Sequence, residues 1–524
     1  ANEMKTKLFL AAMAAIAVVG CNKNSVETPA PSLEGPSAML KVNIKSKATK
    51  AYEVGTAEEN AVSSVDFYFY DAAGQPYSVV PGSNAIKWTA AEAGSAENIE
   101  AVSDVVLVIK QAETTPPAKV VAILNSPANY GNFALADLGN QVVESLYTET
   151  PATETAGAQV TDFVMSNSVY YNEDLGTVMV ASEITQENIF VDPDYDGEAG
   201  AKYEGEVNVT PIDIYVERVA AKVTVAFPAE NVPVKDEEGK TMVDSEGNAV
   251  YADFTGWNVT NATDEAYLVK NLDAPYAFNW TWNAPADFRS FWAETSDTPE
   301  HKHTFTALEG HTQPFDYYFE NTAREASQFL VAARLVNEEG ENISLAKWYN
   351  VLYTVADAKT AVANTLANKL YLLEGDKLVS VTADDITFYQ REYTADDNRY
   401  EVLVKATEGT TYYKPGLVEG KPVVYTEKEL AAIFEAVEPI QMWEEGMTYY
   451  YVTINHVEGA APAIVRNHQY QINVTGVKGF GTPVYDPNQI IIPEPVDPQD
   501  ALNLAAQINV LSWNIVSQDV VLGN

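Results

Sequence analysis

Gln507-Ile-Asn-Val-Leu-Ser-Trp-Asn-Ile-Val-Ser-Gln-Asp-Val-Val-Leu522 lies close to the end of the 524-residue chain and is rich in β-branched and aromatic residues. This composition predicts a strand. The preceding residues 482–500 contain five prolines, which favour an extended, semi-rigid spacer that does not pack. A lone strand can neither pair its backbone nor bury its side chains. We therefore expect this arm to return to its own domain or to pair with another molecule.

The side chains of the arm do not follow one simple alternation. Ile508 and Val510 fall on one face of a regular strand, whereas Leu511, Trp513 and Ile515 fall on the other. A bulge near Val510, or two short strands, would reconcile the two sets. The candidate anchors of the arm are Ile508, Val510, Leu511, Trp513, Ile515, Val520 and Leu522.

The overall composition narrows the possible functions. The formal net charge is -42, which argues against binding to nucleic acid or to an anionic membrane, because both require clusters of Lys and Arg. The hydrophobic fraction of 46% is enough for large cores, and the length predicts two domains, with room for a third. Abundant Tyr, Thr and Val favour β structure. The single cysteine excludes an internal disulfide framework.

The N-terminus resembles a bacterial lipoprotein signal. Basic residues at 5 and 7 precede an apolar run over residues 8–19, which is too short to span a bilayer comfortably. The run ends in Val-Val-Gly-Cys21, which is similar to a lipobox. We expect residues 1–20 to be removed and Cys21 to be acylated. The alternative is an ordinary signal peptide with a chance cysteine.

A second predicted strand lies upstream of a lysine cluster. Leu40, Val42 and Ile44 alternate with polar residues, which is typical of a half-buried strand. Lys45, Lys47 and Lys50 follow, and no arginine precedes Arg218. A solvated loop is the usual meaning of such a cluster. The sharper hypothesis is a cleavage site for a trypsin-like protease, because polar exposed segments are preferred sites of proteolysis.

Between residues 62 and 474, the sequence patterns predict strands with a few short helices. Residues 62–71, 105–109, 120–124 and 163–171 are predicted strands, and the leucines and valine between 135 and 146 have helical spacing. Residues 212–227 form the longest strand-like stretch and should lead into a second domain. There, residues 329–335, 450–454 and 470–474 are predicted strands. Thr426 and Glu429 form a capping box that starts a helix reaching Val437.

Four short segments together resemble the fimbrilins of the Bacteroidales, the subunits of type V pili. They are Val216-Glu-Arg-Val-Ala-Ala-Lys-Val223, Asn125 after an apolar strand, Met165-Ser-Asn167, and Val465-Arg-Asn-His-Gln-Tyr470. Each is weak alone, but they occur in the family's order behind a lipobox. The resemblance is strongest to the major subunit of the short, Mfa-type fimbria, and it extends loosely from Cys21 to Leu522.

This resemblance implies a mainly β fold with two Greek-key-like β-sandwich domains, a few short helices and a C-terminal donor-strand arm. The expected segments are the lipidated propeptide with its first strand over 21–50, one domain over 51–227, a second over 228–480, and the spacer with the donor strand over 481–524.

The resemblance also implies a mechanism of assembly. A trypsin-like maturation protease would remove the propeptide with Leu40, Val42 and Ile44, preferably between Lys50 and Ala51, with Lys47 and Lys45 as rivals. The best-known family members are cut after arginine, so a protease of different specificity is needed here. The arm of another copy would then fill the vacated groove, giving a head-to-tail filament on the cell surface.

Other partners follow from the same resemblance. They are accessory anchor and tip subunits, and ligands on host or bacterial surfaces. A stalk role is favoured by the long spacer, and a tip or anchor adhesin is the alternative. A surface glycan-binding lipoprotein is an alternative of another class, although it does not explain the lysine cluster or the arm.

Evidence for chemistry is sparse. The histidines at 301, 303 and 311 form the one cluster that could bind a metal, and a solvated loop is the default interpretation. Asp192, Asp194 and Asp196 resemble the start of a calcium loop, but its twelfth position is Tyr203. No nucleophile elbow, P-loop or zinc-protease motif is found. We therefore expect no cofactor and no enzymatic activity.

Overall fold

The protein is mainly β, as the sequence predicts. The computed structural model describes residues 37–45, 52–54, 56, 58–59, 61–80, 82–89, 105–110, 116–149, 161–167, 170–172, 177–192, 210–275, 291–294, 303–321, 327–391, 401–454, 464–488, 490–491 and 504–514. Cys21, Lys47, Lys50, Ala51, Asp194, Asp196, Ile515, Val520 and Leu522 lie outside these residues.

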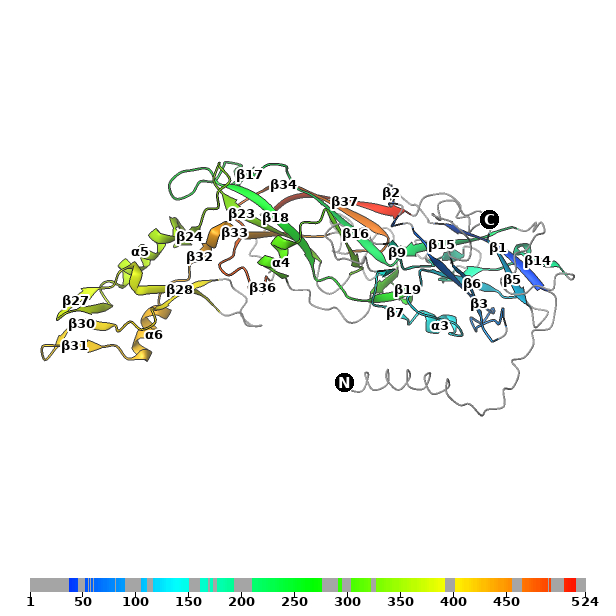
Figure 1. Cartoon of the computed structure of the whole chain (residues 1–524), viewed down its shortest axis with the longest axis horizontal. Coiled ribbons are helices and arrows are strands. Elements are labelled where there is room, and N and C mark those ends of the chain that lie inside the picture. Colours follow the sequence, from blue (N-terminus) through cyan, green and yellow to red (C-terminus); the bar gives the residue numbers. More distant parts are fainter. Residues whose placement is uncertain are drawn as a thin grey trace, which may run out of the picture.

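The N-terminal half is built on one large sheet (Figure 1). Its strand order is β14 (Ile189–Asp192), β1 (Ser37–Lys45), β15 (Ile212–Arg218), β10 (Met165–Asn167), β6 (Lys119–Leu124), β3 (Ser64–Tyr70) and β4 (Ala85–Thr89). In addition, β5 (Val105–Lys110) pairs with β1, and β13 (Ser182–Glu183) pairs with β6. Short pairs are β8 (Tyr147–Glu149) with β9 (Thr161–Phe163) and β11 (Tyr170–Asn172) with β12 (Thr177–Met179).

Both faces of this sheet are covered. In β3, Phe67 and Phe69 enter one hydrophobic core, whereas Tyr68 and Tyr70 enter a second core on the opposite face. A strand that is buried on both faces needs apolar residues at nearly every position, which explains the continuous apolar run of β6.

The predicted helix over residues 135–146 is wrong beyond its first turn. Helix α3 (Leu135–Leu138) ends before Gly139, and β7 (Val142–Val143) pairs with β19 (Ala266–Pro275). Two adjacent valines favour a strand, and this pairing across the chain overrides the helical spacing of the leucines.

The stretch 212–227 passes from one half of the molecule to the other. It divides at Val219 into β15 and β16 (Ala220–Ala226), which belong to different sheets. The second sheet has the order β2 (Tyr52–Val54), β37 (Leu504–Asn514), β34 (His468–Val477), β16 and β22 (Phe315–Phe319). The third has the order β17 (Val232–Pro233), β18 (Tyr251–Thr260), β23 (Gln328–Val336), β33 (Met447–Thr453) and β35 (Thr482–Pro483).

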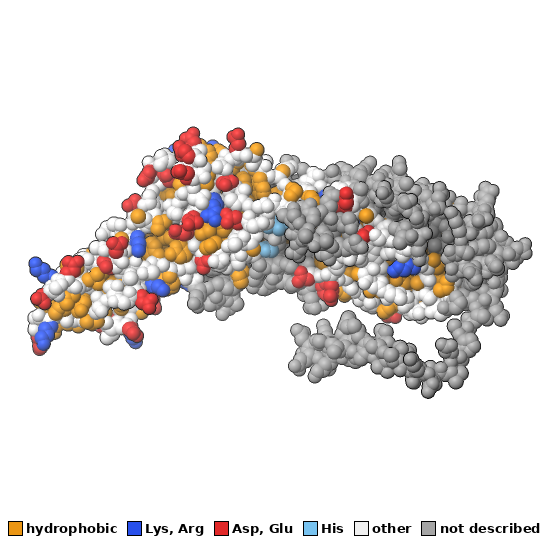
Figure 2. Space-filling model, in the orientation of Figure 1, with side chains coloured by type: hydrophobic (Ala, Val, Ile, Leu, Met, Phe, Trp, Pro, Cys, Tyr) orange, Lys and Arg blue, Asp and Glu red, His pale blue; other side chains and the backbone are white. Residues whose placement is uncertain are grey.

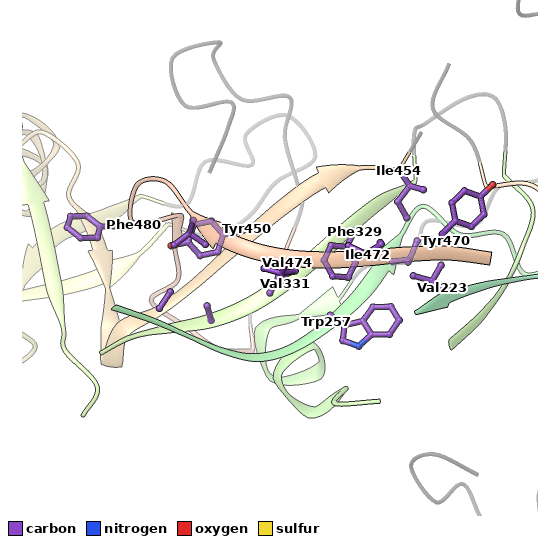
Figure 3. Packing of buried hydrophobic residues seen from close by; sticks show 14 of the residues in the cluster. Val223, Trp257, Phe329, Val331, Tyr450, Ile454, Tyr470, Ile472, Val474 and Phe480 are labelled. Atoms are coloured by element: carbon purple, nitrogen blue, oxygen red, sulfur yellow. The ribbon is translucent and has the colours of Figure 1, made fainter. Parts of the chain in front are cut away.

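These two sheets enclose the C-terminal core (Figure 3). Trp257 and Phe329 from one sheet pack in the same cluster as Tyr470 and Ile472 from the other, and all four are buried. The predicted strand over residues 470–474 is therefore confirmed, and its alternate residues Tyr470, Ile472 and Val474 belong to this core. A 3-10 turn η2 (Gln186–Asn188), β20 (Phe291–Glu294), β21 (His303–Thr304), α4 (Phe305–Gly310) and β36 (Ile490–Ile491) are the remaining elements outside the inserted lobe.

A lobe inserted between β23 and β33 has its own core and projects from the far end of the molecule (Figure 1). Its strands are β24 (Leu345–Trp348), β25 (Val351–Thr354), β26 (Tyr371–Glu374), β27 (Lys377–Ser380), β28 (Ile386–Gln390), β29 (Val402–Ala406), β30 (Tyr413–Val418), β31 (Lys421–Val424) and β32 (Gln441–Trp443). Its helices are α5 (Val355–Leu366) and α6 (Glu427–Glu435), with 3-10 turns η3 (Ala383–Asp385) and η4 (Glu444–Gly446). The predicted capping box of α6 is confirmed, because Thr426 and Glu429 bond each other's backbone N–H groups.

Candidate functional site

Strand β1 occupies an interior place in the first sheet. Its residues 37–42 pair antiparallel with β5 along one edge. Along the other edge, residues 37–40 pair antiparallel with β14, and residues 42–45 pair parallel with β15. Both edges of the strand are therefore engaged.

Strands β5 and β14 depend on β1. Within the described residues, β1 is the only strand with which either of them pairs. Without β1, the hydrogen-bonding groups of β5, β14 and one edge of β15 would lose their partners, and unpaired buried backbone groups are costly. The sheet is therefore complete only while a strand lies in this slot.

The strands beside β1 contribute to the first core. The register partners of Val42 and Ile44 are Ile212 and Ile214, both buried in that core. Leu40 is opposite Ile189, which packs against the same cluster. The three residues predicted from the sequence as a removable strand thus all lie in β1, and their register partners in β14 and β15 belong to or pack against one hydrophobic core.

The arm returns to its own domain. Strand β37 pairs antiparallel with β34 over residues 504–512, and its end at residues 512–514 pairs parallel with β2 (Figure 1). Ile508 and Val510 are the register partners of Ile472 and Tyr470. On its own domain the arm forms one strand over these residues, and the register shift of this pairing lies in β34, between Val474 and Gly476.

The expectation that the spacer does not pack is wrong for residues 482–491. Thr482 and Pro483 pair with β33, and the backbone N–H and C=O of Val484 bond Met447 and Glu444. The carbonyl of Pro487 accepts hydrogen bonds from Thr306, and β36 pairs with β21. Prolines bar a regular ladder but allow such isolated contacts. The docked part of the spacer therefore reaches Ile491, which is 2% exposed.

A buried polar cluster at the junction of the two halves was not foreseen from the sequence. The Lys222 Nζ lies 2.5 Å from Glu59 Oε1, and the Tyr317 hydroxyl donates to the same oxygen at 2.6 Å. Arg218 Nε donates to the Glu59 carbonyl at 3.2 Å. Burial raises the pKa of Glu59, but the hydrogen bonds from Lys222 and Tyr317 outweigh it, so the net pKa lies below the ordinary value. Burial lowers the pKa of Arg218 to about 10, so it stays charged at neutral pH.

The two longest family-like segments meet at this junction. Strands β16 and β34 are parallel neighbours, with Lys222 opposite Gln469. Asn467 donates its N–H to the Ala220 carbonyl, and its side-chain oxygen accepts from the N–H of Arg218. The charged side chains of the two segments pair with other parts of the chain: Lys222 with Glu59, Glu217 with Lys270, and Arg466 with Glu320.

Arg466 forms a second buried contact there. Its Nη1 and Nη2 donate to the carbonyls of Leu268 and Tyr267 in β19, and its guanidinium lies 3.5 Å from Glu320. Lys270 in the same strand lies 3.3 Å from Glu217. Buried pairs add little net stability but are costly to break, so they fix one relative placement of the strands that carry them.

The metal candidates lie only partly within the described residues, because His301, Asp194 and Asp196 fall outside them. His303 Nε2 contacts the carbonyl of Val259, whereas His311 Nε2 contacts the Asp316 carboxylate at 3.0 Å. Asp192 is the last residue of β14, where it pairs with Ser37. No three His, Cys, Asp or Glu gather closely enough for a metal in the part of the chain that the structure describes.

Lys45, one of the three candidate cleavage residues, is the last residue of β1 and pairs with Tyr215. The other two lie between β1 and β2, which belong to different sheets. Within the described residues, no helix is both long and apolar enough to cross a membrane.

Comparison with known proteins gave one family match, over the C-terminal part of the chain. Residues 441–519 match the family described as "Major fimbrial subunit protein type IV, Fimbrillin, C-terminal". No curated protein matches the chain. The structure is similar to a fimbrilin of Porphyromonas gingivalis, with 14% identity, a TM-score of 0.39, and coverage of 91% of this chain and 98% of that one.

Two further solved structures are similar over the same share of this chain. One is a tip fimbrial protein of Porphyromonas gingivalis with a C-terminal truncation, with 11% identity, a TM-score of 0.30, and coverage of 91% and 100%. The other is described as a putative cell adhesion protein of Bacteroides eggerthii, with 10% identity, a TM-score of 0.37, and coverage of 91% and 97%.

Proposed function

We propose that this chain, whose residues 441–519 match the fimbrillin C-terminal family, is a stalk subunit of a surface fimbria of the short, Mfa-type class. It is exported as a lipoprotein through Cys21. A protease removes the segment that contains β1, and the arm of a neighbouring copy takes the vacated slot. The resulting filament supports adhesion, together with anchor and tip subunits and ligands on other surfaces.

The observation that carries this proposal is the place of β1. One strand near the N-terminus is the sole described partner of two others and lies beside β15, whose Ile212 and Ile214 are buried in a hydrophobic core. Its removal leaves a slot whose two sides present unpaired backbone, which is the acceptor required for strand addition. An ordinary edge strand would leave no such slot.

The arm has the properties of a donor. Strand β37 covers residues 504–514, which is long enough to replace the nine residues of β1. In the isolated subunit, β37 is paired with β34. Transfer of the arm to the slot of a neighbouring copy would therefore exchange one set of ladder hydrogen bonds for another. Such an exchange avoids leaving the hydrophobic strand exposed to water.

The positions of the three candidate lysines favour cleavage after Lys47 or Lys50 over cleavage after Lys45. Lys45 is paired within β1, and proteases cut backbone that is not held in a sheet. Cleavage after Lys47 or Lys50 leaves β2 with the mature chain and releases the whole of β1. We prefer the bond between Lys50 and Ala51, because it removes the complete lysine cluster.

The test is a trypsin titration of the chain that lacks residues 1–21, followed by gel electrophoresis with mild heating and by electron microscopy. Cleavage near Lys50 should be followed by detergent-resistant ladders and filaments. The chain truncated after residue 503 is the control, and it should be cleaved equally well without forming ladders. A Lys47→Ala/Lys50→Ala variant should resist cleavage and remain monomeric.

A clean cut that leaves the full-length arm in a stable monomer would contradict the stalk role. Ladders that persist after truncation at residue 503 would contradict strand exchange, because the polymer would then be held by another surface.

A further inference from the structure

We infer that the arm enters a neighbour's slot in one register, in which Ile508-Asn509-Val510 takes the place of Val42-Asn43-Ile44. This inference rests on the proposed function and specifies how the donor and the acceptor fit. It assigns the specificity of assembly to four alternate residues of the arm. The acceptor is β5, β14 and β15 of a second copy of this chain.

The first argument is the composition of the two strands at alternate positions. Residues 38, 40, 42 and 44 of β1 are Ala, Leu, Val and Ile. Residues 504, 506, 508 and 510 of β37 are Leu, Ala, Ile and Val. The same four residue types recur, exchanged within each adjacent pair. Because protein cores are tightly packed, a substitution that conserves total volume is tolerated best.

The second argument is that no neighbouring register fits as well. A shift of one residue would place Gln507 and Asn509 opposite the buried core. A shift of two residues in one direction would set Ser512 opposite Ile214, and in the other it would set Ala506 opposite Ile212. The rival set beginning at Leu511 would insert Trp513, which is far larger than any residue of β1 at these positions.

The third argument is the register of the arm on its own domain. The register partners of the four residues Leu504, Ala506, Ile508 and Val510 are Val477, Val474, Ile472 and Tyr470. All four partners are buried in the C-terminal core. In the slot, the corresponding partners of the last two positions would be Ile212 and Ile214, which are equally buried.

The direction of insertion follows from the strands that line the slot. β1 runs parallel to β15 and antiparallel to β5. If the inserted arm runs in the same direction as β1, Gln507 takes the position of Lys41. The register partner of Lys41 in β5 is Val106. Val108 is the partner of Met39, two residues away along the same face.

The test is a pair of double-cysteine variants in the cleaved full-length chain, Gln507→Cys/Val106→Cys and Gln507→Cys/Val108→Cys. The mature chain contains no other cysteine, because Cys21 is the only one in the sequence and lies in the removed segment. Directly opposite residues have Cβ atoms roughly 4.5–5.5 Å apart, and diagonal neighbours about 7–8 Å, beyond disulfide range. After assembly and mild oxidation, we expect the Val106→Cys pair to give covalent ladders on a denaturing, non-reducing gel. The Val108→Cys pair should give at least about tenfold fewer.

Preferential cross-linking of the Val108→Cys variant, or equal cross-linking of both, would overturn the register. Electron microscopy of the same reduced samples separates this result from failure of the proposed function, because filaments would then be present without the predicted link. Absence of filaments in the unmodified cleaved chain would instead overturn strand exchange, and the register with it.

A second measurement does not depend on disulfide geometry. Ile508→Asn should slow ladder formation by at least about tenfold, because it places a polar group against the core, whereas Leu511→Asn should change it by less than about threefold. Equal loss in both variants would contradict the assigned face.

Discussion

Glu59 illustrates how one residue connects distant parts of the chain. Its carboxylate meets Lys222 and Tyr317, and its carbonyl meets Arg218. Removing its charge leaves Lys222 without its closest carboxylate, and breaking a buried pair costs roughly 3–5 kcal/mol. We expect Glu59→Gln to lower the free energy of unfolding by about this amount at pH 7, as measured by urea denaturation.

The loss of unfolding free energy in Glu59→Gln should become smaller as the pH falls. The pKa of Glu59 is lowered on folding, so its ionised form stabilises the protein above the unfolded pKa, and this contribution disappears as the pH falls through the folded pKa. The difference between the variant and the parent should therefore shrink below about pH 4. Glu429→Gln, in an exposed capping box, is the matched control and should have a much smaller effect. A difference that grows on acidification would contradict this account.

Gly256 lies at a position where the neighbouring backbone leaves no room for a side chain. It lies at the register shift between β18 and β23, and a Cβ there would overlap the Leu308 carbonyl oxygen in α4. We expect Gly256→Ala to destabilise the protein by about 3 kcal/mol or more, because the obstacle is backbone. Gly310→Ala is the control, since no atom lies within 4 Å of its added Cβ, and it should change stability by less than about 0.5 kcal/mol. Similar melting temperatures for the two variants would refute the steric explanation.

Among the described strands, β5 and β14 each depend on β1 for their pairing. Because β1 is the only described strand that pairs with them, deletion of residues 21–50 should remove the amide protection of residues 105–110 and 189–192. Hydrogen exchange measured by mass spectrometry would detect this change. Residues 468–477 in β34 serve as the internal control and should keep their protection. Unchanged protection of β5 would mean that another segment replaces β1.

The elements that sequence reasoning found are those with local signals. The capping box placed the start of α6, and the apolar runs placed β5 and β6. Helix α5 was missed, although Thr354 caps it and Ala358, Val362 and Leu366 form its buried stripe. The helix over residues 135–146 was wrong because a distant strand competes for its second half.

The candidate site could be predicted only in part. The alternation of Leu40, Val42 and Ile44 identified β1, but nothing near it in the sequence indicates that β5, β14 and β15 surround it. Pairing partners so far apart in sequence are set by the whole sheet rather than by local propensity. The packing of the spacer was missed for the same reason, because its contacts are with Met447, Glu444 and Thr306.

At the scale of the whole molecule, charge should control the rate of assembly. The net charge is -42, and acidic side chains outnumber basic ones on the face shown in Figure 2. Two such subunits repel each other, and salt screens this repulsion over about 10 Å at 0.1 M. We expect cleaved subunits to form ladders several-fold faster at about 200 mM than at about 20 mM NaCl. Light scattering would follow the reaction, with sucrose at matched osmolarity as the control. Faster assembly at low salt would indicate attraction between oppositely charged patches.

The place of β1 between strands on both sides has a mechanical consequence for a filament. A strand held in that slot is pulled along its own axis when the fibre is stretched, and antiparallel ladder hydrogen bonds lie perpendicular to that axis. The load is then shared by the ladders along both edges at once, instead of opening them one after another. Because the spacer is docked as far as Ile491, only residues 492–503 connect it to the strand, with a maximum reach of about 40 Å. A fibre built in this way has little slack between its subunits and transmits tension through sheared sheets.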